Sequence, residues 1–330
     1  MSKYLLYIVL AFAFVSCLNI ETAEQERNVE IIDTTSVEDY TIQEYAAESL
    51  LGQKLYPPEL SNRDKNKREQ QLSDALVDFN SDPDSLDYII WFGRRLSYLF
   101  LYKEAITVYT DGLRKFPNSY ELYRHRGHRF LTIRNFDNAI ADLQKAAFLM
   151  RDKPIKMESS GASGSRSIPR SSVQFNVWYH LGLAYYLKGN YDKSVSAYKQ
   201  CLALANNDDM VVSATDWLYM TYRRLGNVEA AEELLEGIHP RMNVIEKKSY
   251  LRKLLFYKGS IRSNQIFDAE RTDLSAGQMT YGYGLGNWYY YNGNTTRAFE
   301  IFNKIMESKN WPSFGYLAAE VELANQNMAP

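Results

Sequence analysis

The stretch VWYHLGLAYYLKGNYDKSVSAYKQCLAL, residues 177–204, decides the fold of this chain. Its apolar residues recur at intervals of three and four, and Gly189 and Asn190 divide it into two halves. Residues three or four apart share one face of a helix, so this spacing predicts two amphipathic helices joined by a short turn. The small residue Gly182 in the first half would let the two helices approach each other closely.

The same pattern recurs upstream with a period of 34 residues. The matching pairs are Pro83 and Pro117, Gly93 and Gly127, Tyr102 and Phe136, and Ala105 and Ala139. Glycine and alanine provide close helix contacts, and proline ends the second helix of each unit because it cannot continue the backbone hydrogen bonds. The sequence therefore predicts an array of repeated helix pairs.

This period, with glycine in the first helix, an aromatic residue at the turn and alanine early in the second helix, resembles the tetratricopeptide repeat (TPR). The resemblance implies an all-α fold, a right-handed TPR-type α-solenoid of antiparallel helix pairs. We expect the solenoid to span residues 51–330, with a capping helix at 312–326, because solenoids need covered ends. The expected repeats are 86–119, 120–153, 175–208, 212–244, 245–278 (degenerate) and 279–311.

An insertion breaks the period between the second and third repeats. Gly127 and Gly182 are 55 residues apart, which is 34 plus 21. The added segment, residues 153–172, is rich in Ser, Gly and Pro and is expected to be a flexible loop. Its basic residues leave open a role as a contact arm, although we favour a neutral insertion.

The N-terminus predicts export. Residues 1–16 have a basic start and an apolar run too short to span a bilayer, as in a signal peptide. The ending FVSC resembles the lipobox of bacterial lipoproteins, which implies lipidation of Cys17 and a place in the outer membrane. Residues 17–50 are rich in acidic side chains and predict a solvated tether. The alternative is an ordinary cleaved signal with a chance cysteine.

Composition and motifs argue against two other functions. The chain has 38 basic and 40 acidic residues, whereas a nucleic-acid-binding protein needs a basic surface. Hydrolase, metalloprotease, P-loop and dinucleotide signatures are absent from the sequence. We therefore expect neither an enzyme nor a cofactor. With only Cys201 besides Cys17, a lipidated chain has no intramolecular disulfide.

The segment RHRGHR, residues 124–129, contains a candidate anion contact. Arg124 and His128 are four residues apart and share a helix face, where together they would bind a carboxylate or phosphate. Arg126 occupies a packing position, which predicts a buried ion pair with an acid of a neighbouring helix. His125 lies on another face, and a metal site is not expected because the helix lacks further ligands.

The repeat register of the TPR family implies an aromatic and cationic inner groove. The residues placed there are Arg94, Tyr98, Arg124, His128, Tyr179, Tyr186, Arg223, Lys253, Tyr283, Asn287 and Tyr290. Such a surface favours binding of another envelope protein or a peptide segment, with tyrosines as anchors. The expected function is a membrane-anchored scaffold or assembly factor of the bacterial cell envelope. The alternative is an outer-membrane lipoprotein that binds a glycan or small ligand.

Overall fold

The computed structural model describes residues 45–159, 168–267 and 275–328. The signal peptide, Cys17 and most of the expected tether lie outside the described residues. Within them the fold is all-α apart from two short antiparallel hairpins. In these hairpins β1 (Ala47–Glu48) pairs with β2 (Lys54–Leu55), and β3 (Met157–Glu158) pairs with β4 (Ser171–Ser172). The predicted fold class is confirmed.

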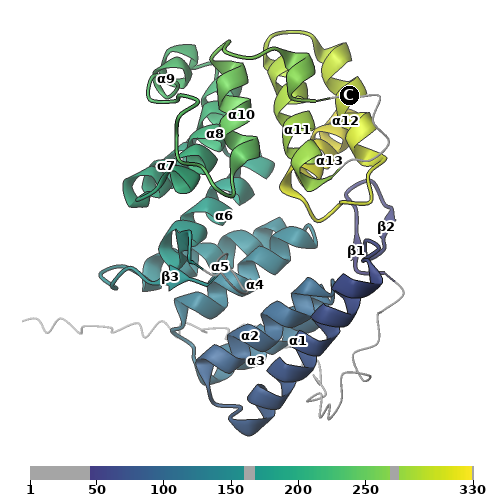
Figure 1. Cartoon of the computed structure of the whole chain (residues 1–330), viewed down its shortest axis with the longest axis vertical. Helices are drawn as coiled ribbons and strands as arrows, with labels where there is room; N and C mark the ends of the chain where they lie inside the picture. The colour runs from purple at the N-terminus through teal and green to yellow at the C-terminus, as the bar shows by residue number, and fades with distance from the viewer. Residues whose placement is uncertain (1–44, 160–167, 268–274, 329–330) are drawn as a thin grey trace, which may run out of the picture. The chain divides into compact units, whose positions relative to one another are not determined.

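The helices follow one another as packed neighbours. They are α1 (Asn62–Ser81), α2 (Leu86–Tyr98), α3 (Tyr102–Lys115), α4 (Tyr120–Thr132), α5 (Phe136–Leu149), α6 (Val173–Leu187), α7 (Tyr191–Leu204), α8 (Asp208–Arg224), α9 (Val228–Glu233), α10 (Lys248–Tyr257), α11 (Ala276–Tyr291), α12 (Thr295–Met306) and α13 (Phe314–Met328). Helices α2 and α3, α4 and α5, α6 and α7, and α11 and α12 form tight pairs, and each pair packs on the next element (Figure 1). This is the repeated arrangement of a TPR-type solenoid.

Glycine lets the paired helices approach each other. A Cβ atom added to Gly182 in α6 would lie 2.9 Å from the ring of Tyr198 in α7, closer than van der Waals contact allows. At Gly93 in α2 an added Cβ would overlap the ring of Tyr109 in α3. Both tyrosines are fully buried. The predicted packing role of these glycines is therefore confirmed.

The turn after the first helix of each repeat uses left-handed backbone. Later repeats place glycine there, as at Gly189 (φ 71°) and Gly293 (φ 85°). The first two repeats instead place Phe100 (φ 66°) and Arg134 (φ 67°) at this position. The left-handed conformation costs a non-glycine residue about 1–2 kcal/mol. Both side chains make contacts that glycine could not: Phe100 meets the ring of Tyr102 edge to face, and Arg134 forms an ion pair with Glu320.

The C-terminal helix is embedded in the fold. Residues 316–324 of α13 are all buried, so the helix has no solvent-facing side over this stretch. Glu320 forms an ion pair of 2.5 Å with Arg134, which follows α4. Glu322 forms an ion pair of 3.0 Å with Arg224 at the end of α8. The helix thus contacts repeats distant in sequence, in addition to covering α11 and α12 as a cap would.

Three segments differ from their expected structure. Ala46 and Ala47, placed in the tether by the sequence, are buried in the first hairpin. The fourth repeat has only the short α9 as its second helix, and after α10 the degenerate repeat has a 3₁₀ turn at Ser263–Gln265. The insertion forms the hairpin of β3 and β4 at its ends. None of the helices among the described residues is both long and apolar enough to cross a membrane.

Candidate functional site

The main candidate site is a cavity of about 340 Å³, named here the first cavity. The first helices of five successive units, α2, α4, α6, α8 and α10, all contribute lining residues, and the insertion and the start of α13 complete the wall. Its charged lining residues are Arg94, Arg124, Glu158, Arg170, Asp209, Glu246 and Lys247. The cavity therefore lies on the surface where the sequence predicted binding.

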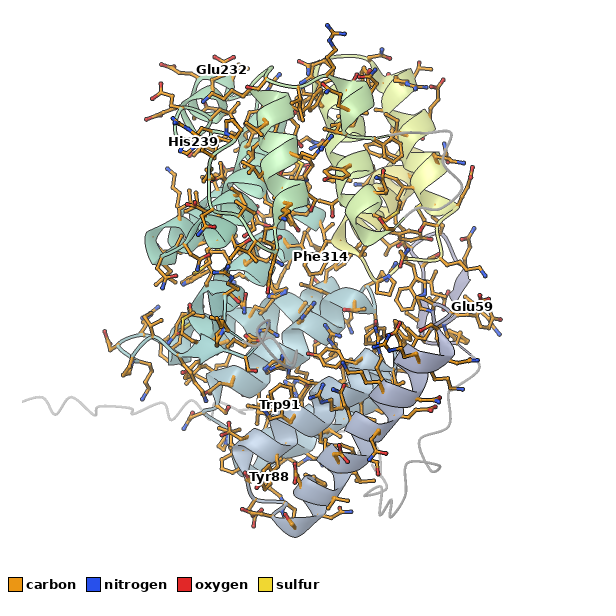
Figure 2. The ribbon with its side chains drawn as sticks, in the orientation of Figure 1. Glu59, Tyr88, Trp91, Glu232, His239 and Phe314 are labelled. Carbon is orange, nitrogen blue, oxygen red and sulfur yellow. The ribbon has the colours of Figure 1, made fainter. Side chains whose placement is uncertain are left out.

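Arg94 and the insertion form one edge of the first cavity. The guanidinium of Arg94 donates to the carbonyl oxygen of Ser159 at 2.7 Å and to the hydroxyl of Tyr98 at 3.1 Å. The same group lies 4.2 Å from the ring centroid of Trp91, whose position Figure 2 marks. Stacking on this ring orients the guanidinium. Arg94 and Tyr98, predicted together, are therefore hydrogen-bonded in the structure.

Arg124 lies deeper in the wall and is 7% exposed. Its guanidinium is 3.0 Å from Glu158 of the insertion and donates to Nδ1 of His125 at 3.0 Å. Burial, followed by the charge of Arg124, lowers the pKa of His125 well below 6.5, so this imidazole is neutral and accepts the bond. The Nε of Arg124 is buried without a hydrogen-bond partner among the described residues.

The ring of His128 lies against that of His180 of α6, with their centroids 4.1 Å apart and their planes inclined by 33°. Burial lowers the pKa of both rings well below 6.5, and nearby arginines act in the same direction. Both rings are therefore neutral at pH 7. Nδ1 of His180 lies 2.5 Å from the carbonyl oxygen of Asn176 and donates to it, which leaves Nε2 as an acceptor. The positive charge near His128 thus comes from arginine.

Tyr179 contributes its ring to the cavity wall but is only 7% exposed. Its hydroxyl lies 3.0 Å from that of Tyr250 and accepts a bond of 2.9 Å from Nε1 of Trp217. Because the hydroxyl already has partners within the chain, Tyr179 supports the cavity wall. Arg94, Arg124, His128 and Tyr179 are the predicted groove residues that meet in this cavity.

Four other predicted groove residues are buried. The hydroxyls of Tyr186 and Tyr283 lie 2.7 Å apart, and the amide of Asn287 donates to Tyr186 at 3.0 Å. Lys253 is 1% exposed and forms an ion pair of 2.6 Å with Asp216. The prediction that these four residues line an open groove is wrong, because packed helices cover them and their polar groups bond within the chain.

The last two predicted residues lie outside the lining of the first cavity. Arg223 donates to the side-chain oxygen of Asn292 at 2.9 Å and lies over the ring of Tyr291. Tyr290 is half-buried, and the guanidinium of Arg224 lies 4.3 Å from its ring centroid. The structure therefore does not bring these two side chains together with Arg94 and Arg124.

Residues of the insertion are part of the site, contrary to the expectation of a neutral loop. Glu158, Ser159 and Arg170 all line the first cavity. Arg170 lies 3.6 Å from Asp209, whose carboxylate also accepts backbone N–H groups of residues 245–247. The basic residues of the insertion were the available signal in the sequence. The position of these basic residues depends on the pairing of β3 with β4, and the sequence around them does not predict that pairing.

Arg126 forms the ion pair that the sequence predicted. Its Nε and Nη2 atoms donate to the two carboxylate oxygens of Asp142 in α5, each at 2.7 Å. The pair joins α4 to α5 and therefore belongs to the scaffold. Across the described parts of the chain, no group of three or more His, Cys, Asp or Glu side chains is placed to hold a metal ion.

One family model and several solved structures are similar to parts of this chain. The tetratricopeptide-repeat family model matches residues 175–208, which contain α6 and α7. The solved structure of MamA has 17% sequence identity to this chain and a TM-score of 0.41. The matched region covers 62% of this chain and 100% of the MamA chain. No curated protein matches this chain in sequence.

Two further solved structures are similar at the same level. YrrB, described as a TPR protein with an unusual peptide-binding site, is 14% identical, with a TM-score of 0.41, and covers 76% of this chain and 99% of its own. A putative kinesin light chain of Podospora anserina with TPR-like repeats is 12% identical, with a TM-score of 0.40, and covers 74% of this chain and 97% of its own.

Proposed function

We propose that this chain is a non-catalytic, protein-binding scaffold or assembly factor that holds a segment of another protein in the first cavity. One observation carries the proposal: five successive first helices contribute to a single cavity that contains four cationic side chains. TPR-type solenoids present such inner surfaces to protein or peptide partners. A scaffold binds and positions its partner without a catalytic residue. The four cationic side chains of the cavity support such binding.

The cavity favours a partner with carboxylate groups. Glu158 is already paired with Arg124, and Asp209 is held by backbone N–H groups, so these two acids are used within the chain. The third lining acid, Glu246, is exposed, and the four cationic side chains outnumber the three acids. Lys247 is exposed and Arg94 is partly exposed at the cavity, where both are accessible to a ligand. Arginine and lysine form charge-assisted hydrogen bonds with carboxylates. An acidic side chain of the partner would therefore bind between them.

The proposed location is the cell envelope, with the chain anchored through a lipid on Cys17, in the outer membrane. The support comes from the lipobox-like FVSC ending and the apolar run before it. The acidic residues that follow Cys17 would then separate the folded repeats from the membrane surface. The partner would be another envelope protein.

Crosslinking in intact envelopes followed by pull-down tests this function. The protein should capture a defined partner, and Arg94→Gln combined with Lys247→Gln should reduce its yield at least fivefold. Arg297→Gln, which changes an exposed arginine of α12, is the matched control and should retain the partner. Equal capture by all variants would exclude the first cavity as the binding site.

The lipid anchor has its own test. Cys17→Ser should move the protein from the membrane fraction to the soluble fraction without changing its fold. Continued membrane association of the Cys17→Ser protein would rule out the lipid as the anchor. This measurement is independent of partner capture, so the two parts of the proposal can fail separately.

The second candidate function is binding of a glycan or small ligand. The ring of Phe314 lines the first cavity and is only partly buried, and aromatic rings stack on sugar faces. Affinity electrophoresis in glycan-containing gels separates the two functions. Retardation that Phe314→Ala abolishes would support glycan binding, and unchanged mobility in every glycan would leave the protein-binding function.

A further inference from the structure

A second cavity of about 330 Å³ adjoins the first, and the two share wall residues. His128 and Phe314 line both cavities. Their ring centroids lie 5.6 Å apart, so these two rings form the boundary between the cavities. Figure 2 places Phe314 at the start of α13, between the helices of the first repeats and those of the last repeats. A ligand that passes this boundary would contact both cavities.

The second cavity is cationic. Arg68 of α1 and Arg129 of α4 line it, and its lining contains no Asp or Glu among the described residues. Arg68 donates to the carbonyl oxygen of Tyr98 at 2.6 Å, and Arg129 lies over the ring of Tyr102, 5.2 Å from its centroid. A carbonyl and a ring do not neutralise a guanidinium, and neither arginine forms an ion pair with an acid in the part of the chain that the structure describes. The cavity is therefore complementary to a negatively charged group.

The backbone at Phe100 is strained, and the ring of this residue forms part of the wall of the second cavity. Phe100 lines the second cavity and adopts φ 66°, where later repeats have glycine. Its ring lies beneath the guanidinium of Arg68 at 5.9 Å and meets Tyr102 edge to face. The strained backbone thus supports an aromatic wall beside the two arginines. Backbone strain of this kind concentrates at functional sites.

The two adjoining cavities suit an extended ligand. An extended chain advances ~3.3–3.6 Å per residue and presents alternate side chains to the same surface. It can therefore place separate acidic side chains in the two cavities.

We propose that the two cavities together bind one extended, acidic segment of a partner protein, which crosses the boundary formed by His128 and Phe314. This inference rests on the proposed function and adds the partner's chemistry and a second subsite. Carboxylates on one side of the boundary bind Arg94 and Lys247. Carboxylates on the other side bind Arg68 and Arg129.

Peptide length provides the test. Fluorescein-labelled tetraglutamate and decaglutamate are titrated with the full folded chain and followed by fluorescence anisotropy. Tetraglutamate, about 13 Å long when extended, is too short to fill both cavities, whereas decaglutamate, about 33 Å long, spans both and should bind at least tenfold more tightly. Arg129→Gln should abolish most of this advantage while leaving the tetraglutamate Kd within twofold. Arg94→Gln combined with Lys247→Gln should weaken both peptides, and Arg297→Gln should weaken neither.

Two further variants keep the result interpretable. Arg129→Lys preserves the charge and should retain the decaglutamate affinity, and Arg68→Gln should reproduce the loss if Arg129→Gln fails to fold. If tetraglutamate binds but neither second-cavity variant affects decaglutamate, the two-cavity inference is wrong and the proposed function stands. If tetraglutamate does not bind at all, the carboxylate site in the first cavity is wrong as well.

Discussion

The substitution Arg134→Gly separates backbone strain from a buried charge interaction. Arg134 is 3% exposed and adopts φ 67°, and Glu320 is fully buried. The guanidinium donates to Glu320 at 2.5 Å and 3.1 Å, which joins the second repeat to α13. Glycine at this position would relieve the strained backbone. It would also leave the carboxylate without its cation.

The two effects differ in size. Relief of the left-handed conformation is worth about 1–2 kcal/mol. Removal of one partner of a buried ion pair costs about 3–5 kcal/mol because an uncompensated charge stays buried. The N–H of Leu50 donates to the same carboxylate at 2.5 Å and limits this cost. We therefore expect Arg134→Gly to lower the free energy of unfolding by about 1–4 kcal/mol, the difference between the two effects.

Urea denaturation measures this change. Far-UV circular dichroism follows the helices, and tryptophan fluorescence reports on the five tryptophans, among them Trp311, whose ring centroid is 5.1 Å from the guanidinium of Arg134. The double variant Arg134→Gly with Glu320→Gln should recover part of the loss, because a neutral amide needs no counter-charge. Phe100→Gly, at the same turn of the preceding repeat, is the control without an ion pair. Unchanged or higher stability of Arg134→Gly would refute the reasoning.

Three further predictions concern packing and pH. Gly93→Ala should lower the free energy of unfolding by about 1–2 kcal/mol through overpacking, measured by urea denaturation. Gly277→Ala, where an added Cβ has space, should raise it by about 0.5–1 kcal/mol. Burial lowers the pKa of His125, His128 and His180 well below 6.5, so the unfolded chain binds more protons below that pH. Asp216, with a pKa raised to about 6, opposes this effect in part. Stability should therefore fall by about 3 kcal/mol between pH 7.5 and 5.5, and a rise on acidification would contradict the assignment of neutral histidines.

The helix pairs could be predicted because their determinants are local. Gly182 and Tyr198 are 16 residues apart, and a helix, a turn and a second helix bring them together without help from distant sequence. The ion pair of Arg126 with Asp142 has the same separation and was predicted for the same reason. The repeat period fixes which faces meet, so contacts within a pair follow from spacing alone.

The candidate site could be predicted only in part. The register predicted Arg94 and Arg124 for one surface, and both line the first cavity, because α2 and α4 belong to regular repeats. It failed for Tyr283 and Asn287, whose polar groups bond within the packed interior. The contacts of the insertion, such as Glu158 with Arg124, were missed because they depend on a hairpin between segments outside the repeat pattern.

Closure of the inner surface restricts where a partner can bind. Glu320 lies 186 residues from Arg134, and the chain tolerates a left-handed arginine to keep this contact. A partner that needed an open groove along the whole solenoid would have to displace α13. This helix is buried and is joined to the repeats by ion pairs, so it would oppose such binding. The same helix supplies Phe314 to the boundary between the two cavities. Because α13 is embedded in the fold, most of the predicted groove is closed. Phe314, the first residue of α13, shapes the part that remains open to a ligand.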